Sequence, residues 1–312
     1  LAIVDILDAL VIRRYGRGDG TFDPAPALPG IFQPRAVAAL SRDPAQERDL
    51  VSADQGTHLL ALYRPDGRPR SYAAPVVAKG GELPRALVSG DLNDDGVDDL
   101  VVANEGSNDV SVILLGGDGE PLSSVAYPVG VEPYGLALGD LDGDGRLDLA
   151  VANRLDGTIS VLLADGPGTF GPASTHDARP DPRSVVIGDF DGDGVADVAA
   201  TSYKDDELTI LRNLGDGAEF TAVFLVPGIG VYALAAGDLD ADGSVDLVAV
   251  NRDSAEVVII RHLSSGIPSF GALPVDAGPL DLALADLNGD GALDVVVVAT
   301  AAGGVSLLLS DP

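Results

Sequence analysis

The chain has 312 residues, and its 49 acidic side chains outnumber 19 basic ones to give a formal net charge of −30. Such a chain repels phosphate backbones and anionic lipid surfaces because it lacks clustered positive charge, so we exclude nucleic acid as a partner. It contains no cysteine, which excludes disulfides, thiolate metal ligands and a thiol nucleophile.

The predicted elements are many short strands joined by turns. Apolar residues make up 46% of the chain and aromatic ones only 4%, while 39 glycines and 21 prolines interrupt the apolar runs. This composition is typical of a β-protein with a core of Val, Leu, Ile and Ala. The longest nearly apolar stretch, residues 295–309, is broken by Thr300, Gly303 and Gly304 and is shorter than the roughly 18 residues of a spanning helix. We expect two strands and a turn there, and no membrane insertion.

One pattern, Asp-x-Asp/Asn-x-Asp-Gly-x-x-Asp, recurs five times, beginning at positions 91, 140, 189, 238 and 286. The intervals between these starts are 49, 49, 49 and 48 residues. Each acidic loop follows a short run in which apolar and other residues alternate, and it precedes a run of mostly apolar residues. A third β-rich run, a Gly-rich turn and a less regular fourth segment complete the unit. Four short strands in about 49 residues, without helical periodicity, predict a blade of a β-propeller.

The same register extends towards both ends of the chain. Residues 35–50 align with residues 85–100, and residues 1–5 align with residues 149–153. We therefore predict one all-β propeller domain over residues 1–312, with seven blades of four antiparallel strands and the acidic loops between strands 1 and 2. The predicted units span residues 1–34 (partial), 35–84, 85–133, 134–182, 183–231, 232–279 and 280–312 (partial).

A six-bladed ring is the alternative, because the first unit lacks its opening strand and the last unit lacks its fourth. A closed propeller must join its first and last blades, since their sheet edges otherwise stay open. In a six-bladed ring the N-terminal segment would complete the last blade as its outer strand, and the leftover residues would lie outside. The start within a unit at Leu1 leads us to expect upstream sequence before this chain.

The acidic loops predict metal sites. Side chains at positions 1, 3, 5 and 9 of each loop can converge on one point, the glycine at position 6 permits a sharp turn, and the carbonyl at position 7 adds an oxygen. A hard cation such as Ca²⁺ requires such all-oxygen ligation, so we expect about five Ca²⁺ ions that brace the fold in place of disulfides. The predicted ligand sets are Asp91, Asn93, Asp95, the Val97 carbonyl and Asp99; Asp140, Asp142, Asp144, the Arg146 carbonyl and Asp148; Asp189, Asp191, Asp193, the Val195 carbonyl and Asp197; Asp238, Asp240, Asp242, the Ser244 carbonyl and Asp246; and Asp286, Asn288, Asp290, the Ala292 carbonyl and Asp294.

Two other interpretations of these loops are weaker. Polar Asp-Gly turns are common between strands, but a turn needs one acid and not several in register. Magnesium prefers a small octahedral shell and keeps its waters, so it fits these ligand sets less well than Ca²⁺. The matching positions of the second unit lack two carboxylates and the turn glycine, so we predict no metal there; they are Ser41, Asp43, Ala45, Gln46 and Asp49.

The residue six places before each loop marks the start of the innermost strand, on the face opposite the acidic loops. Arginine offers planar bidentate donors to a carboxylate or sulfate, and tyrosine offers a stacking face and a hydroxyl to a sugar. The alternative is that these are solubilising residues that pair with nearby acids. The candidate ligand-binding residues are Arg35, Arg85, Tyr134, Arg183 and Tyr232, with Leu280 in the same register; the loops between strands 2 and 3 add Asn104, Glu105, Asn153, Arg154, Tyr203, Lys204, Asn251 and Arg252.

Other motifs in the chain do not indicate a site. The Arg-Gly-Asp tripeptide at residues 17–19 falls where other units have their Gly-rich turn, so we interpret it as a turn. His58, His176 and His262 occupy different positions within their units and lack the spacing of a zinc site or a catalytic triad. No Gly-x-Ser-x-Gly elbow, phosphate loop or nucleotide fingerprint occurs, and we predict no catalytic residue.

The repeat resembles the FG-GAP or VCBS repeats of the integrin α-subunit β-propeller and of related bacterial and fungal surface proteins. The resemblance rests on the acidic loop, framed by Gly-Asp-Leu/Phe and Asp-Leu-x-Val-Ala-Asn, and on Phe-Gly pairs at residues 170–171 and 270–271, which are altered at residues 22–23 and 220–221. It covers essentially the whole chain. It implies an extracellular or periplasmic protein that binds proteins or carbohydrates; seven-bladed fungal lectins of similar architecture bind sugars between blades, and some related propellers belong to polysaccharide lyases.

We expect a non-enzymatic propeller, secreted or at the cell surface, that serves adhesion or recognition of a carbohydrate or protein ligand on the face opposite the metal loops. Five metal sites without a regulatory design suit millimolar extracellular calcium better than scarce cytosolic calcium. Two alternatives remain: a polysaccharide lyase that uses a Tyr or Arg of the same face, and a purely structural module of a larger surface protein. The fold by itself does not fix the ligand.

Overall fold

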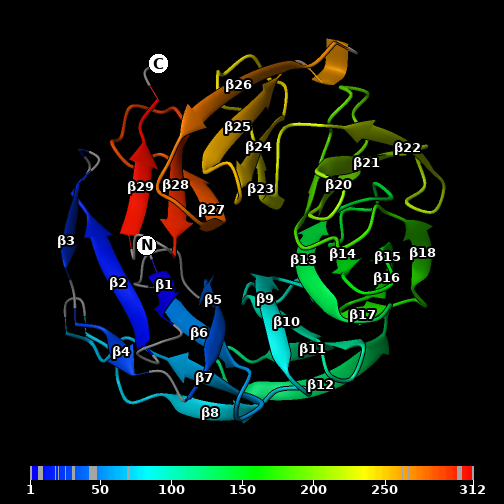
Figure 1. Cartoon of the computed structure of the whole chain (residues 1–312). Helices are drawn as coiled ribbons and strands as arrows, with labels where there is room; N and C mark the ends of the chain where they lie inside the picture. The colour runs from blue at the N-terminus through cyan, green and yellow to red at the C-terminus, as the bar shows by residue number, and fades with distance from the viewer. Residues whose placement is uncertain are drawn as a thin grey trace.

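Short antiparallel sheets follow one another around a central axis in the computed structural model of the chain (Figure 1). The structure describes residues 2–5, 10–17, 19, 21–24, 26–29, 32–41, 48–68, 71–261, 263–265, 267–300 and 304–310. Within these residues it contains strands and one 3-10 helix, η1 (Leu263–Ser265), and no helix long and apolar enough to cross a membrane. The prediction of an all-β propeller is confirmed.

Five sheets have four antiparallel strands each, in the order of the sequence from the axis outwards. Their strands are β5 (Pro34–Leu40), β6 (Asp49–Asp54), β7 (Leu59–Tyr63) and β8 (Val76–Lys79); β9 (Pro84–Gly90), β10 (Asp99–Asn104), β11 (Asp109–Leu115) and β12 (Pro121–Pro128); β13 (Pro133–Gly139), β14 (Asp148–Asn153), β15 (Thr158–Leu162) and β18 (Ser174–Asp177); β19 (Val185–Gly188), β20 (Asp197–Ser202), β21 (Glu207–Asn213) and β22 (Phe220–Leu225); and β23 (Val231–Gly237), β24 (Asp246–Asn251), β25 (Glu256–Arg261) and β26 (Ser269–Pro274). A small hairpin of β16 (Ala164–Gly166) and β17 (Thr169–Phe170) interrupts the third of these sheets.

A sixth blade has three strands in the described chain: β27 (Pro279–Ala285), β28 (Asp294–Ala299) and β29 (Gly304–Leu308). Six blades therefore contribute an inner strand near the axis, which matches the six-bladed alternative and not the preferred count of seven. The difference arises because the N-terminal unit has no described strand at the innermost position.

The N-terminal strands form a sheet of their own: β1 (Ala2–Asp5), β2 (Leu10–Gly16), β3 (Phe22–Pro24) and β4 (Leu28–Pro29). This sheet lies between the sixth blade and the blade of β5–β8, and β1 packs beside β5 (Figure 1). We had expected, for a six-bladed ring, that this segment would add an outer strand to the last blade. In the described residues β1 pairs with β2 instead, a local hairpin that costs less loop-closure entropy than pairing with the far end of the chain.

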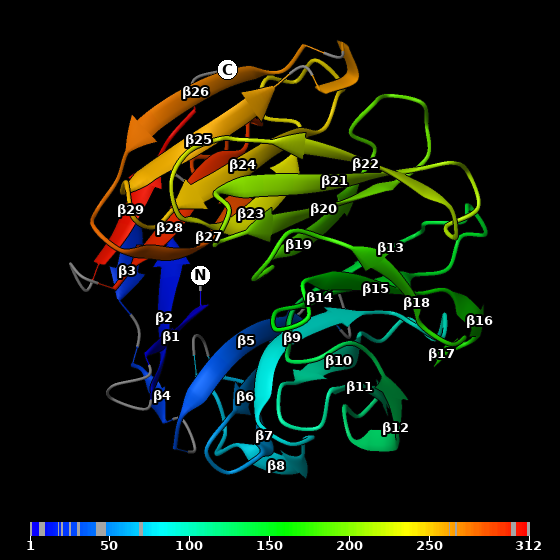
Figure 2. The same cartoon turned by 45° about the vertical axis from the view of Figure 1, so that its right-hand side comes forward.

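The second strand of each blade is the most buried element. All six residues are buried in β6, β10, β14, β20 and β24, whereas every residue of the outer strand β26 is exposed. Each second strand has a paired strand on both sides and a neighbouring blade on both faces, which explains its nearly continuous apolar sequence. Leu100 is 1% exposed, and it packs with residues of the previous blade such as Leu40 and Leu60. Figure 2 shows these two blades, β5–β8 and β9–β12, side by side. The core thus consists of apolar layers between blades.

A buried asparagine at the end of the second strand fixes the connection between blades. Asn104 is fully buried, and its Nδ2 donates to Asp109 Oδ1 at 2.7 Å and to Ser111 Oγ at 2.9 Å. Gly81, in the connection from the previous blade, lies directly on it: a Cβ at residue 81 would come within 2.1 Å of Asn104 Cγ. The Asn residues at 153 and 251 meet Gly130 and Gly228 in the same way. These asparagines hold the fold and do not face a ligand.

We predict that Gly81→Ala lowers the free energy of unfolding by roughly 1–3 kcal/mol, because the added methyl group overpacks the contact with the Asn104 side chain. Gly117→Ala is the matched control, since nothing lies within 4 Å of its added Cβ, and it should change stability by less than about 0.5 kcal/mol. Urea unfolding of both variants measures the difference. Equal midpoints for the two variants would contradict this account of the blade connection.

Candidate functional site

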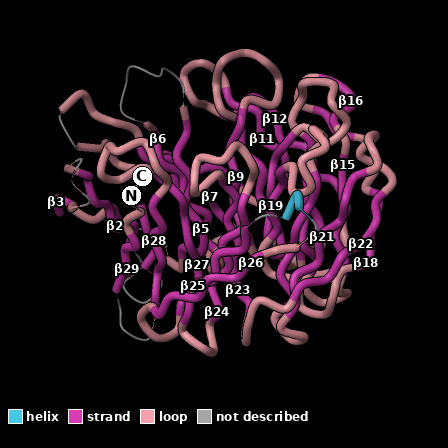
Figure 3. The backbone as a smooth tube through the Cα atoms, turned by 90° about the horizontal axis from the view of Figure 1, so that it is seen from above, coloured by secondary structure: helices cyan, strands magenta, loops and turns pink. Residues whose placement is uncertain are grey.

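The two ends of the inner strands carry different chemistry. Seen from the side, the strands occupy the middle of the molecule and loops lie at both ends (Figure 3). In the blade of β9–β12, Arg85 stands near the start of the inner strand and the acidic loop begins at Asp91, directly after its end. Six residues of extended chain separate the two by about 20 Å. The acidic loops join strands 1 and 2, and the Arg and Tyr residues gather at the opposite face.

Three acidic loops bring carboxylates together. The acids at positions 1, 3 and 9 have one oxygen each within 4.8 Å of the others in the clusters Asp140, Asp142 and Asp148; Asp189, Asp191 and Asp197; and Asp238, Asp240 and Asp246. The glycine at position 6 has a positive φ in all five loops, between 83° and 90°. The three clusters have the donor chemistry to hold a metal ion, as the sequence predicted for positions 1, 3 and 9.

The position-5 acids are not members of these three clusters, and each accepts a local backbone hydrogen bond. In the loop of residues 189–197, Asp193 Oδ1 accepts a hydrogen bond from the Val195 N–H at 2.8 Å. Asp144, Asp242 and their equivalents make the same local contact. The loops that begin at Asp91 and Asp286 have asparagine at position 3, so each offers one carboxylate fewer. Most of the second-unit positions, residues 42–47, lie outside the described residues, so the prediction of no metal there stays a prediction.

The position-9 aspartate is buried and ties the loop to the sheet. Asp99 accepts hydrogen bonds from the Leu92 N–H at 3.2 Å and from the Leu115 N–H, at the end of the third strand, at 2.8 Å. The same pair of bonds recurs in the loops that begin at positions 140, 189 and 286. Burial raises the pKa of Asp99, Asp197 and Asp246 to about 6, against the opposing effect of these backbone bonds. A bound cation would favour the ionised form.

Two of the acidic clusters also contact an arginine of the third strand. Arg261 Nε lies 3.3 Å from Asp240 Oδ2 and 3.9 Å from Asp246 Oδ2, and Arg212 Nη1 lies 3.7 Å from Asp191 Oδ2. The corresponding position is Leu114 or Leu163 in two other blades. A guanidinium group at this place competes with a metal ion for the same oxygens.

At the opposite face, bulges in the inner strands present the candidate residues. Pairing skips one residue of the inner strand at Arg35, Arg85, Tyr134, Tyr232 and Leu280. A bulge re-aims the side chain of the extra residue out of the regular alternation. In five blades, therefore, the residue six places before the start of the acidic loop is the extra residue of a bulge.

Four of the five candidate residues meet in what we call the axial cluster, defined by Arg85, Tyr134, Arg183 and Tyr232. The hydroxyls of Tyr134 and Tyr232 are 2.8 Å apart, although the two residues are 98 positions apart in the chain. Arg85 Nη2 donates to the Tyr134 hydroxyl, and its Cζ lies 3.9 Å from the centroid of the Tyr134 ring. The Cζ atom of Arg183 lies 4.7 Å from the centroid of the Tyr232 ring. Guanidinium groups thus occupy ring faces that we had expected to stack on a sugar.

Residues around the axial cluster pair with acids. Arg183 forms two hydrogen bonds to Asp181, of 3.1 and 3.0 Å, and the ring of Tyr203 lies 4.2 Å from its Cζ. Arg154 bonds the Glu132 carboxylate. Arg183 and Arg154 therefore pair with nearby acids, and the Arg183 pair is largely buried.

Arg35 stands apart from these contacts. Its Nε donates to Gln55 Oε1 at 2.8 Å, and Gln55 Nε2 in turn donates to Glu105 Oε2 at 3.2 Å. It forms no ion pair among the described residues. The candidates from the sequence therefore lie on one face, with Arg35 outside the hydrogen bonds of the axial cluster.

The sequence analysis missed Asp281. This residue follows Leu280 on β27, where the equivalent positions of other blades carry Ala86, Gly135 and Ser184. Those small residues contact the next blade: a Cβ at Gly135 would lie 2.6 Å from the Arg183 carbonyl oxygen. The next sheet after β27 has no described inner strand, and Asp281 is exposed. Asp281 is the one charged residue at a register position where the other units have Ala, Gly or Ser, and this difference is the signal in the sequence that could have identified it.

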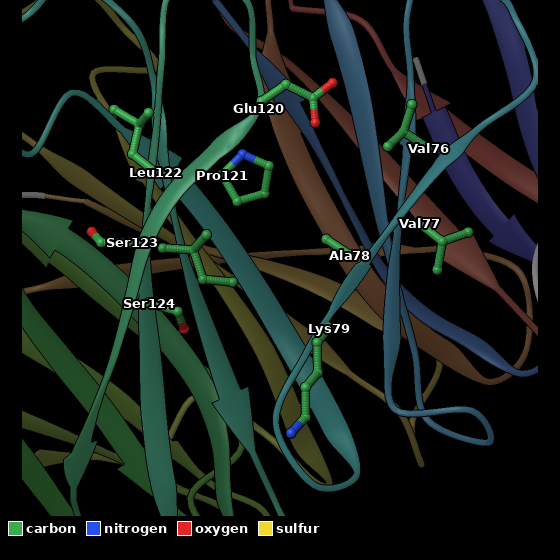
Figure 4. Close-up of a pocket in the computed structure, with 10 residues that line it drawn as sticks. Val76, Val77, Ala78, Lys79, Glu120, Pro121, Leu122, Ser123 and Ser124 are labelled. Carbon is green, nitrogen blue, oxygen red and sulfur yellow. The ribbon is translucent and has the colours of Figure 1, made fainter.

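A separate groove lies on the outer rim, between the outer strands β8 and β12 of neighbouring blades. It has a volume of about 420 Å³. Val76, Val77 and Lys79 line one side and Leu122 and Ser124 the other (Figure 4). Leu122 is 68% exposed. Its polar lining residues are Lys79, Glu120, Ser123 and Ser124.

Comparison with known proteins supports the repeat assignment. A family profile described as FG-GAP-like repeat matches residues 91–151, 140–200, 189–249 and 238–297. These segments together span two thirds of the chain, and they confirm the resemblance. A comparison with curated protein sequences found no match.

Solved structures of similar shape include BBS1N in complex with ARL6DN, with a TM-score of 0.70, 14% identity, and coverage of 98% of this chain and 86% of that one. Hydrazine synthase of Kuenenia stuttgartiensis has a TM-score of 0.69 and 16% identity, with coverage of 99% and 92%. A lectin of Agrocybe aegerita, solved for its recognition of non-reducing terminal N-acetylglucosamine, has a TM-score of 0.59 and 19% identity, with coverage of 86% and 75%. At these identities the likeness shows the fold alone.

We predict that Arg261→Leu strengthens binding of a divalent cation by the loop of residues 238–246 about threefold, because a half-exposed ion pair that competes for the same oxygens is lost. The cation concentration that gives half of the rise in melting temperature measures this effect. Arg179→Leu is the control, since Arg179 pairs with Glu207 of the blade that precedes the one with this loop. Unchanged or weaker cation binding in the Arg261 variant would refute the competition.

Proposed function

Since the chain belongs to the FG-GAP-like repeat family, we propose that it is a non-enzymatic recognition module, braced by Ca²⁺, that binds a carbohydrate or protein ligand at the axial cluster. The observation that carries this proposal is the convergence of Arg85, Tyr134, Arg183 and Tyr232 from four blades. Charged and aromatic groups from distant parts of the chain meet there, and Arg85, unlike Arg183, forms no ion pair among the described residues. A site of this kind recognises a ligand without a nucleophile or a metal-bound water.

Calcium fits the acidic loops better than other ions. Each loop supplies only oxygen donors, from carboxylates, amides and a main-chain carbonyl, and Ca²⁺ accepts six to eight such ligands in flexible geometry. The position-1 carboxylate is already oriented by the loop: Asp140 accepts hydrogen bonds from the N–H groups of Gly143 and Gly145, at 2.7 and 2.9 Å. Bound ions would offset the repulsion among the clustered acids and so stabilise the connection between the first two strands.

The site chemistry also supports a place outside the cell. Loops that have three or four acidic ligands, and no further segment that closes over the ion, suit the millimolar calcium found outside the cell. The net charge of −30 opposes binding to anionic surfaces and nucleic acid, so the partner is a soluble or surface-displayed ligand. The enzymatic alternative predicts cleavage of an acidic polysaccharide, whereas a recognition module binds it without cleavage.

We predict that about five Ca²⁺ ions bind per chain and that a chelator lowers the melting temperature by several degrees. The three loops with three clustered acids should bind more tightly than the two with asparagine at position 3, because affinity rises with the number of charged ligands. Calorimetric titration gives the stoichiometry. Asp191→Asn should weaken one of the three tighter sites to the affinity of the loops with a native asparagine at position 3, and Asp205→Asn, an exposed acid outside the loops, should leave all five sites unchanged. Binding of Mg²⁺ with equal affinity would contradict the calcium assignment.

We predict that a glycan array identifies a ligand for the calcium-loaded protein and that Arg85→Ala abolishes its binding, because the axial cluster loses its unpaired guanidinium group. Leu122→Asp, in the outer groove, should bind as the native protein does. The reverse pattern would move the site to the outer groove and refute the axial assignment. Release of sugar fragments from a bound polysaccharide would refute the non-enzymatic function.

A further inference from the structure

The last acidic loop contains the one Asn-Gly dipeptide of the chain, Asn288-Gly289, at positions 3 and 4. The main-chain nitrogen of a glycine can approach the preceding asparagine side chain closely, because no Cβ shields it. The residue at position 4 has a positive φ in all five loops, and the value for Gly289 is 80°. Asn288 is half-buried and Gly289 is exposed, so water reaches this dipeptide.

Neighbouring groups are placed on each of the atoms that would react. The Gly289 N–H donates to Asp286 Oδ1 at 2.7 Å, so a carboxylate stands where it can accept the proton of an attacking nitrogen. Asn288 Oδ1 accepts a hydrogen bond from the Asp290 N–H at 3.0 Å, a donor that stabilises the negative charge on this oxygen when Cγ is attacked. Asn288 Nδ2, the leaving group, donates to Asp290 Oδ2 at 2.7 Å. The side-chain amide is thus held and polarised by its own loop.

Each of the other loops lacks a part of this arrangement. Gly143 and Gly192 donate to the position-1 carboxylate at the same distance of 2.7 Å, but an aspartate precedes each of them, and a carboxylate is a poor electrophile. Asn93 is the other asparagine at position 3. Asp94 follows it, and in the described loop the Asp94 N–H makes no hydrogen bond to the Asp91 carboxylate. The loop that begins at position 238 has neither an asparagine nor a glycine at these two positions.

We propose that Asn288 is a self-modification site, at which the loop deamidates its own asparagine with water as the co-reactant. The Gly289 nitrogen forms a bond to Asn288 Cγ and gives its proton to Asp286 Oδ1. The Cγ–Nδ2 bond then breaks, and Nδ2 takes up that proton and leaves as ammonia. Water opens the resulting succinimide ring at either carbonyl. One opening gives aspartate, and the other gives isoaspartate, in which the main chain runs through Cγ.

The reaction changes the metal-binding character of the last loop. Each event replaces a neutral amide by a carboxylate. The aspartate product gives the loop acids at positions 1, 3 and 9, as in the three clusters of the other blades. The isoaspartate product inserts an extra carbon into the main chain and displaces the carboxylate. This consequence rests on the proposed calcium-binding function, whereas the modification itself does not.

The test follows deamidation of the full chain at neutral pH in the presence of a chelator, so that no cation occupies Asp286. Peptide mapping by mass spectrometry measures the loss of each asparagine and separates aspartate from isoaspartate. Asn288 should deamidate at least about tenfold faster than Asn93 in the same molecules, because its loop supplies the proton acceptor and its nitrogen is unshielded.

One variant separates the loop from the dipeptide. Asp286→Asn keeps Asn288-Gly289 and removes the proton acceptor, so it should slow deamidation of Asn288 about tenfold in the folded protein. Asp91→Asn, the matched change in the first loop, should leave the rate at Asn288 unchanged. In urea the native chain and the Asp286→Asn variant should react at the same rate, because the unfolded chain has no loop. Melting temperatures show that each variant is folded in buffer.

The outcomes are distinct. An Asn288 that reacts no faster than Asn93, an Asp286→Asn variant that reacts as fast as the native protein, or a difference between the two that persists in urea would each overturn the proposal. Asn288→Asp supplies the aspartate product in pure form, and in calorimetric titration it should raise the calcium affinity of the last loop to that of the three clusters. Unchanged affinity would refute the calcium function of this loop and leave the modification site standing.

Discussion

The buried aspartate at the end of each acidic loop is the interaction on which the blades depend. In four of the five loops its carboxylate accepts one N–H bond from the loop and one from the end of the third strand, so it ties the loop and the second and third strands together. The cost of burying this group is visible in the pKa of about 6 for Asp99, Asp197 and Asp246. A cation bound by the loop would offset that cost, which links the metal site to the stability of the blade.

The same repeat produces an asymmetric molecule. One register position near the start of the inner strand is occupied in four blades by Arg85, Tyr134, Arg183 and Tyr232. The side chains at this position contact one another, and the contacts differ from blade to blade. The N-terminal sheet interrupts the ring of inner strands, and Asp281 is exposed next to this interruption. The repeated features of the units therefore form the scaffold, and the residues that differ from unit to unit supply the proposed ligand site.

The fold leaves open which activity this scaffold supports. Its structural neighbours include an enzyme and a lectin, at identities that show the fold alone. Function has to be inferred from the groups at the site, and the axial cluster brings together two guanidinium groups and two linked tyrosine hydroxyls.

The sequence by itself determined the blades, the position of the acidic loops between the first two strands and the face on which Arg85 and Tyr134 gather. These follow from local rules, because strand periodicity, turn glycines and ligand spacing act within about 49 residues. Only the tertiary structure decided the number of blades and the contacts within the axial cluster. The cluster depends on contacts between residues that are about 50 to 100 positions apart, such as Arg85 with Tyr134 and Tyr134 with Tyr232, and periodicity within one unit contains no information about them.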